Sequence, residues 1–134
     1  MQPATERPFK ASRFAYRTNT DGLTASNPGA KAGVEDAKES YKCALKMFES
    51  ADKEAREEYQ NNKEAGLTID TFGTWVMQND PVWVAQRAEA EARGAALTSA
   101  AMFAFGQDYM QKIQQGQSEM AQEAYRAGFT PEVF

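Results

Sequence analysis

The chain lacks histidine altogether and has one cysteine among its 134 residues. Without histidine it cannot form Ser-His-Asp or Cys-His nucleophilic sites, histidine zinc sites or a histidine-ligated haem centre. The single thiol, Cys43, excludes disulfides within the chain and cysteine-rich zinc sites, and we expect it to be half-buried and inert. Phosphate-binding glycine motifs are absent as well. We therefore expect a protein that is not an enzyme and has neither metal nor cofactor.

Long apolar runs are missing too. The longest stretch without charge, residues 94–107, is shorter than the roughly 20 residues of a membrane-spanning helix. No apolar stretch follows Met1, so we expect a cytoplasmic or otherwise intracellular protein. The net charge of −4 makes nucleic acid a poor partner. One alternative remains open, a membrane-active, pore-forming type of helical protein whose inserting segment would be residues 94–107.

The sequence is rich in alanine, glutamate, lysine and glutamine and poor in valine and isoleucine. Unbranched side chains lose little rotamer freedom in a helix, so this composition predicts an all-α fold. Residues 1–27 contain proline, glycine and asparagine without helical periodicity, which indicates an extended arm. Residues 28–134 form the second unit, a helical hairpin domain with expected helices at 28–64, 71–78 and 81–127.

The first helix is predicted from Asn27-Pro28, which resembles a capped start, to Gly66, which suits a left-handed C-terminal position. We expect Leu67 to pack back on the last turn. Apolar residues recur in alternating steps of three and four, the heptad pattern of a coiled coil. They are Val34, Ala37, Tyr41, Ala44, Phe48, Ala51 and Ala55. Asp52 and Arg56 are interpreted as a favourable ion pair on the opposite, charged face.

A short connecting helix at 71–78 leads to Asp80-Pro81, a strong signal for a capped helix start. Within the following segment Gly94, Gly106 and Gly116 each cost about 1 kcal/mol relative to alanine. We expect a kink or break of the helix at one of these glycines, and Gly116 is the favoured position. Alanine also recurs at every fourth residue, and such a row of small side chains favours close packing against the first helix. This predicted ridge comprises Ala88, Ala92, Ala96, Ala100 and Ala104.

The arm alternates aromatic and basic side chains, which are Phe9, Lys10, Arg13, Phe14, Tyr16 and Arg17. Nucleic acid can be held by such a pattern through stacking and phosphate pairing. A protein partner fits better, because the body of the chain is acidic and aromatic anchors with arginine at their rim are typical of interfaces. In a third interpretation the arm lies on the body of its own chain or of a neighbour.

Two helices alone would leave much of an apolar stripe uncovered, which favours a protein partner or a homo-oligomer. The sequence thus predicts a structural or assembly protein, either a small helical subunit of a larger complex or a self-associating scaffold. A third possibility is a ligand-binding helical bundle with an aromatic pocket lined by Trp75, Trp83 and Phe103.

Overall fold

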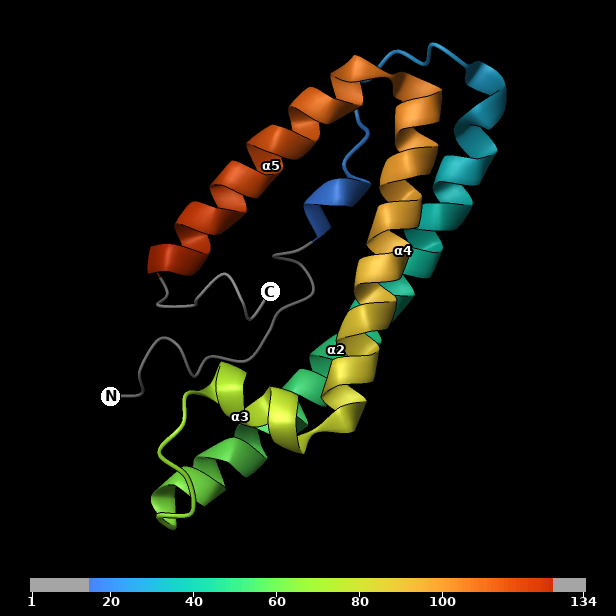
Figure 1. Ribbon diagram of the computed structural model, residues 1–134. Coiled ribbons are helices and arrows are strands. Elements are labelled where there is room, and N and C mark those ends of the chain that lie inside the picture. Colours follow the sequence, from blue (N-terminus) through green and yellow to red (C-terminus); the bar gives the residue numbers. More distant parts are fainter. Residues whose placement is uncertain (1–14, 127–134) are drawn as a thin grey trace.

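The computed structural model describes residues 15–126, and this part of the chain is all-α without a strand. Two short 3-10 helices, η2 (Ala15–Thr18) and η3 (Pro28–Ala30), precede four α-helices. These are α2 (Lys31–Glu64), α3 (Phe72–Asn79), α4 (Pro81–Phe105) and α5 (Gln107–Arg126). The helices α2 and α4 lie side by side as an antiparallel hairpin with α3 at the connection (Figure 1). The predicted all-α fold is confirmed.

The helix α2 ends in a Schellman motif. Gly66 has a φ of 74°, its N–H donates to the carbonyl of Lys63 at 3.1 Å, and the N–H of Leu67 donates to that of Asn62 at 2.9 Å. The expected packing of Leu67 is wrong, since 74% of this residue is exposed. The predicted cap at the start of the first helix is also wrong, because the side chain of Asn27 makes no capping hydrogen bond. The N–H of Asn27 donates to the carbonyl of Ala104 at 3.1 Å.

The seam of the hairpin follows the predicted heptad stripe of α2. Five of its members are buried, namely Val34, Tyr41, Ala44, Phe48 and Ala55, and the other two are half-buried. The helix α4 contributes its own row of buried residues at steps of three, four and seven, which are Trp83, Ala90, Gly94, Leu97, Ala101 and Ala104. Such spacing keeps side chains on one side of a helix, so both faces of the seam have a heptad pattern.

The predicted alanine ridge does not form one packed face. Ala88, Ala92 and Ala96 are exposed, Ala100 is half-buried and Ala104 is buried. Four residues turn an α-helix by about 400°, so each step along the row moves about 40° around the axis. Over four steps the row passes from the solvent side of α4 into the seam. The expectation of burial against the first helix is therefore wrong for the first three alanines.

The starts of α3 and α4 follow from their capping residues. The Asp80 carboxylate accepts a hydrogen bond from the N–H of Trp83 at 2.9 Å, and Pro81 occupies the first helical position as predicted. Thr71 Oγ1 accepts from the N–H of Thr74 at 3.4 Å. These two caps set the sharp turn that carries the chain from α3 into the long helix α4.

The expected helix over 81–127 is broken, at Gly106 and not at Gly116. Gly106 has φ 67° and ψ −141°, a conformation that is essentially restricted to glycine. The chain turns there, and α5 runs back along the hairpin with η2 lying between α5 and α4 (Figure 1). Tyr109 and Ile113 of α5 are buried, so a third helix covers part of the apolar surface that a two-helix hairpin would expose.

Candidate functional site

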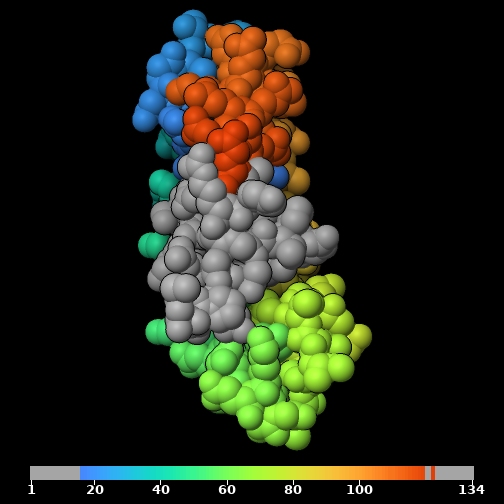
Figure 2. Space-filling model, turned by 90° about the vertical axis from the view of Figure 1, so that its left-hand side faces the viewer, coloured from blue at the N-terminus to red at the C-terminus, as the bar shows by residue number. Residues whose placement is uncertain are grey.

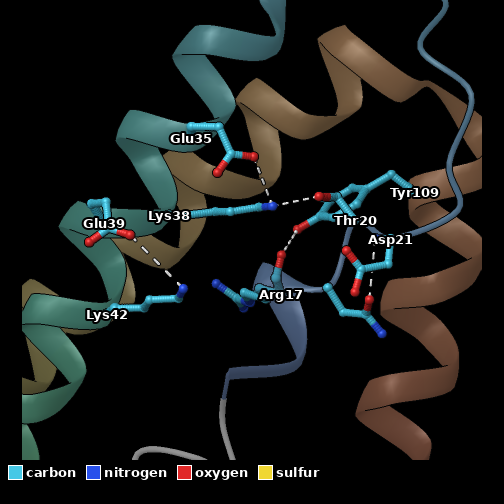
Figure 3. A network of polar contacts seen from close by, with 9 residues as sticks. Arg17, Thr20, Asp21, Glu35, Lys38, Glu39, Lys42 and Tyr109 are labelled. Carbon is cyan, nitrogen blue, oxygen red and sulfur yellow. Dashed lines mark hydrogen bonds and ion pairs between the residues drawn. The ribbon is translucent and has the colours of Figure 1, made fainter.

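The segment from Tyr16 to Asn27, here called the strap, is fastened to all three long helices. From α5, Tyr109 Oη donates a hydrogen bond to the carbonyl of Arg17 at 2.8 Å, and Lys112 Nζ donates to that of Asp21. From α2, Lys38 Nζ donates to Thr20 Oγ1 and also pairs with Glu35 (Figure 3). On α4, the carbonyl of Ala104 accepts hydrogen bonds from the N–H of Asn27 at 3.1 Å and from Ser26 Oγ at 3.3 Å.

The first two strap residues occupy sites where two helices have glycine. A Cβ atom placed on Gly94 of α4 would clash with Arg17 Nη1 and come within 3.0 Å of Tyr41 Cε1. A Cβ atom on Gly116 of α5 would lie 2.8 Å from Tyr16 Cβ. Both glycines are inside continuous helices, so they permit a close approach of the strap and do not mark the kinks that we expected. We call the site formed by Tyr41, Gly94, Tyr109 and Gly116 the niche.

The niche is a low-polarity environment for its two tyrosines. Burial raises the pKa of Tyr41 to about 12 from the ordinary 10.0, against an opposing effect of the nearby Arg17 charge. Burial raises the pKa of Tyr109 as well. The Arg17 guanidinium carbon lies 6.0 Å from the centroid of the Tyr41 ring and 5.9 Å from that of Tyr16. The raised pKa values mean that both phenols keep their protons, and their role as hydrogen-bond donors, to a higher pH than an exposed tyrosine does.

Of the six residues predicted to bind a partner, the structure describes two. Tyr16 and Arg17 lie in the niche of their own chain, which is the third of the three interpretations of the arm. Within the predicted arm, residues 15–27 contain one short 3-10 helix, η2, and no α-helix. The remaining four, Phe9, Lys10, Arg13 and Phe14, lie outside the described residues. Sequence reasoning missed the niche, although a glycine inside a strongly helical segment is a signal of close approach.

Asp52 and Arg56 form a buried polar centre between α2 and α4, and not the surface ion pair that we expected. Their exposed fractions are 0% and 6%. Arg56 Nε donates to Asp52 Oδ2 at 2.7 Å, and Trp83 Nε1 donates to Asp52 Oδ1 at 2.8 Å. The Arg56 guanidinium carbon also lies 4.1 Å from the centroid of the Phe72 ring. The charges are thus satisfied by each other and by the core, which indicates a structural role.

The aromatic residues at this end of the hairpin pack edge to face. Trp83 lies 5.2 Å from Phe48 and 6.1 Å from Phe72 between ring centroids, and Tyr59 lies 5.5 Å from Phe72. Trp75 and Trp83 are buried in this cluster, whereas 68% of Phe103 is exposed. Phe103 is also 20 residues further along α4 than Trp83, or about 30 Å at 1.5 Å per residue. The three residues of the expected aromatic pocket therefore do not meet.

Exposed apolar side chains are concentrated in the segment that connects the two hairpin helices. The described part of the chain has six exposed large hydrophobic residues, and four of them fall within residues 67–82. They are Leu67 at 74%, Ile69 at 100%, Met77 at 53% and Val82 at 61% exposed, and we call them the apolar tip. The loop before α3 and α3 itself project at one end of the molecule (Figure 2). The tip is thus presented away from the strap.

Other chemistry-bearing groups do not gather into a site. Among the described residues, no three carboxylate or thiol side chains are placed to hold a metal ion. Cys43 is exposed and not half-buried as expected. No helix in the described range is both long and apolar enough to cross a bilayer.

Comparisons of this chain with protein-family models, with curated proteins and with solved structures found no match.

Proposed function

We propose that the protein is a non-enzymatic assembly protein, a small helical scaffold that joins to a second copy of itself through the apolar tip. The observation that carries this proposal is the concentration of exposed apolar side chains in Leu67, Ile69, Met77 and Val82. Exposed apolar groups that cluster on one part of a protein are typical of interaction sites.

Burial of the tip in a dimer would provide a favourable free energy of association. Complete burial of an exposed aliphatic side chain contributes roughly 1.5–3 kcal/mol. Association of two proteins loses about 4–15 kcal/mol of translational and rotational free energy. Four such side chains on each of two copies are sufficient to offset a cost in that range. Burial of a single exposed leucine or phenylalanine on each copy would not be sufficient to offset this cost.

A second copy suits the charges that flank the tip. Exposed Lys63, Glu64 and Asp70 carry both signs close to Leu67 and Ile69 in the chain. A two-fold axis brings the same patch of both copies together, so each basic group can face an acidic group of the other copy. A uniformly charged rim would repel such a partner, whereas this mixed rim does not.

The test compares two variants that add the same charge at exposed apolar residues inside and outside the tip. Leu67→Asp with Ile69→Asp should weaken self-association, measured by sedimentation velocity, by more than about tenfold in the dissociation constant, or about 1.4 kcal/mol. The matched control is Phe103→Asp with Met47→Asp, which adds the same two negative charges at the two exposed large hydrophobic residues of the described chain that lie outside the tip. Equal association of the tip variant and the wild type, or equal weakening by the control, would contradict the proposal.

A further inference from the structure

We propose that the niche is a recognition site for a peptide segment in which tyrosine precedes arginine, a site that each chain fills with its own strap and that a second copy can fill by exchange. The occupant is thus Tyr16–Arg17 in cis or the same residues of another copy in trans. This inference concerns a surface other than the apolar tip and does not depend on it.

The two glycines show that the niche is shaped for this segment. A glycine inside a helix costs about 1 kcal/mol relative to alanine, and both α4 and α5 include one where the strap touches them. Gly94 admits the Arg17 guanidinium beside Tyr41, and Gly116 admits the Tyr16 side chain. Successive side chains of one short segment are therefore received by sockets on two different helices.

Polar contacts to the strap main chain complete the site. Tyr109 and Lys112 of α5 donate to the carbonyls of Arg17 and Asp21, as Figure 3 shows for Tyr109. Main-chain hydrogen bonds provide affinity and side-chain sockets provide specificity in many peptide-binding domains. The niche has both features, with an aromatic residue and an arginine as the side chains that it selects.

Exchange between copies follows from the connection of the strap to the body. Residues 19–27, the second part of the strap, link Tyr16 and Arg17 in η2 to η3, and five residues of this linker are exposed, namely Asn19, Asp21, Gly22, Thr24 and Ser26. Nine extended residues reach about 30 Å. Every copy carries both the niche and its ligand, so a strap that leaves its own niche fits that of a neighbour without any new contact. In cis the linker gives an effective concentration of order millimolar, so the chain's own strap occupies the niche in dilute solution.

The experiment uses the full chain with Tyr16→Ala and Arg17→Ala, which empties both sockets. A labelled peptide of residues 15–27 should bind this variant at least tenfold more tightly than it binds the wild type, by fluorescence polarisation. A peptide with the same two alanines should not bind. Adding Gly116→Leu to the variant should abolish binding of the natural peptide by filling a socket. The matched change Gly33→Leu, at a helical glycine with open space around it, should preserve binding.

Equal binding to variant and wild type, absence of binding to both, or binding that survives Gly116→Leu would overturn the proposal. If the double variant does not fold, by circular dichroism, the single change Arg17→Ala takes its place. Failure of both variants to fold would also overturn it, because the strap would then be an inseparable part of the core. Peptide binding should persist with Leu67→Asp and Ile69→Asp, so a failure here is distinguishable from a failure of the tip proposal.

Discussion

At the scale of single residues, Asp52 illustrates how the third dimension changes the meaning of a local pattern. Asp52 and Arg56 are spaced as a favourable surface pair on a helix, and in sequence nothing distinguishes them from the exposed pair Glu89–Arg93. In the structure the wide aromatic ring of Trp83 reaches across from α4 and donates to the Asp52 carboxylate. Only the packing of α4 on α2 reveals that the charge is buried.

Removing one partner of this buried pair should be strongly destabilising. Asp52→Ala leaves the Arg56 guanidinium without its ion pair and the Trp83 N–H without its acceptor, so the free energy of unfolding should fall by about 3–5 kcal/mol. Replacing both charges, as in Asp52→Leu with Arg56→Met, should cost much less, because no uncompensated charge remains. Urea unfolding of the two variants measures the difference. A double variant as unstable as Asp52→Ala would show that the charges themselves stabilise the core.

Alkaline pH should destabilise the protein through the tyrosines of the niche. The unfolded chain loses the Tyr41 proton near pH 10, whereas the folded chain retains it until about pH 12. Between these values the unfolded state binds fewer protons, so the free energy of unfolding falls as the pH rises. The difference between the two pKa values corresponds to about 2–3 kcal/mol. Urea unfolding across this range should show a steeper loss in the wild type than in Tyr41→Phe, which has no proton to lose, and equal slopes would contradict this assignment.

At the scale of elements, periodicity predicted what is local and failed where tertiary contacts decide. The heptad stripe of α2 is confirmed because a spacing of three and four residues specifies one helix face whatever packs on it. The alanine row of α4 misled because a strict fourfold spacing drifts around the helix. The break lies at Gly106 and not at Gly116, which the sequence favoured, and the other two glycines of α4 and α5 contact the strap. The strap itself has no period, so no local pattern could place it.

The drift of the alanine row gives a matched pair of substitutions. Ala101 has no exposed surface and lies in the seam, whereas Ala96 is exposed on the same helix. Ala101→Leu should overpack the seam and lower the free energy of unfolding by about 1–3 kcal/mol. Ala96→Leu should change it by less than about 0.5 kcal/mol. Thermal unfolding distinguishes them, and a large loss for Ala96→Leu would place the ridge back in an interface.

At the scale of the whole molecule, the apolar side chains at one end of the hairpin are covered by the chain itself, and those at the other end are exposed. The strap and α5 cover the upper part of the hairpin in Figure 1, where Tyr109 and Ile113 are buried. At the opposite end, Leu67 and Ile69 in the loop before α3 are exposed, and no helix within residues 15–126 packs over them as α5 does at the other end. The proposed assembly role requires apolar side chains that are exposed and are not needed to hold the fold together. The exposed residues at the connection of the hairpin meet this requirement, because a second copy can bury them without disturbing the packed helices.

The central claim is self-association through the apolar tip, and the molar mass in solution of the wild-type protein beside that of Leu67→Asp with Ile69→Asp tests it most directly, because only association through the tip should be lost in that variant. Multi-angle light scattering over a range of protein concentrations should give a mass that rises above the 14.9 kDa of one chain towards twice that value. A mass that stays at 14.9 kDa up to concentrations of order millimolar would contradict the account.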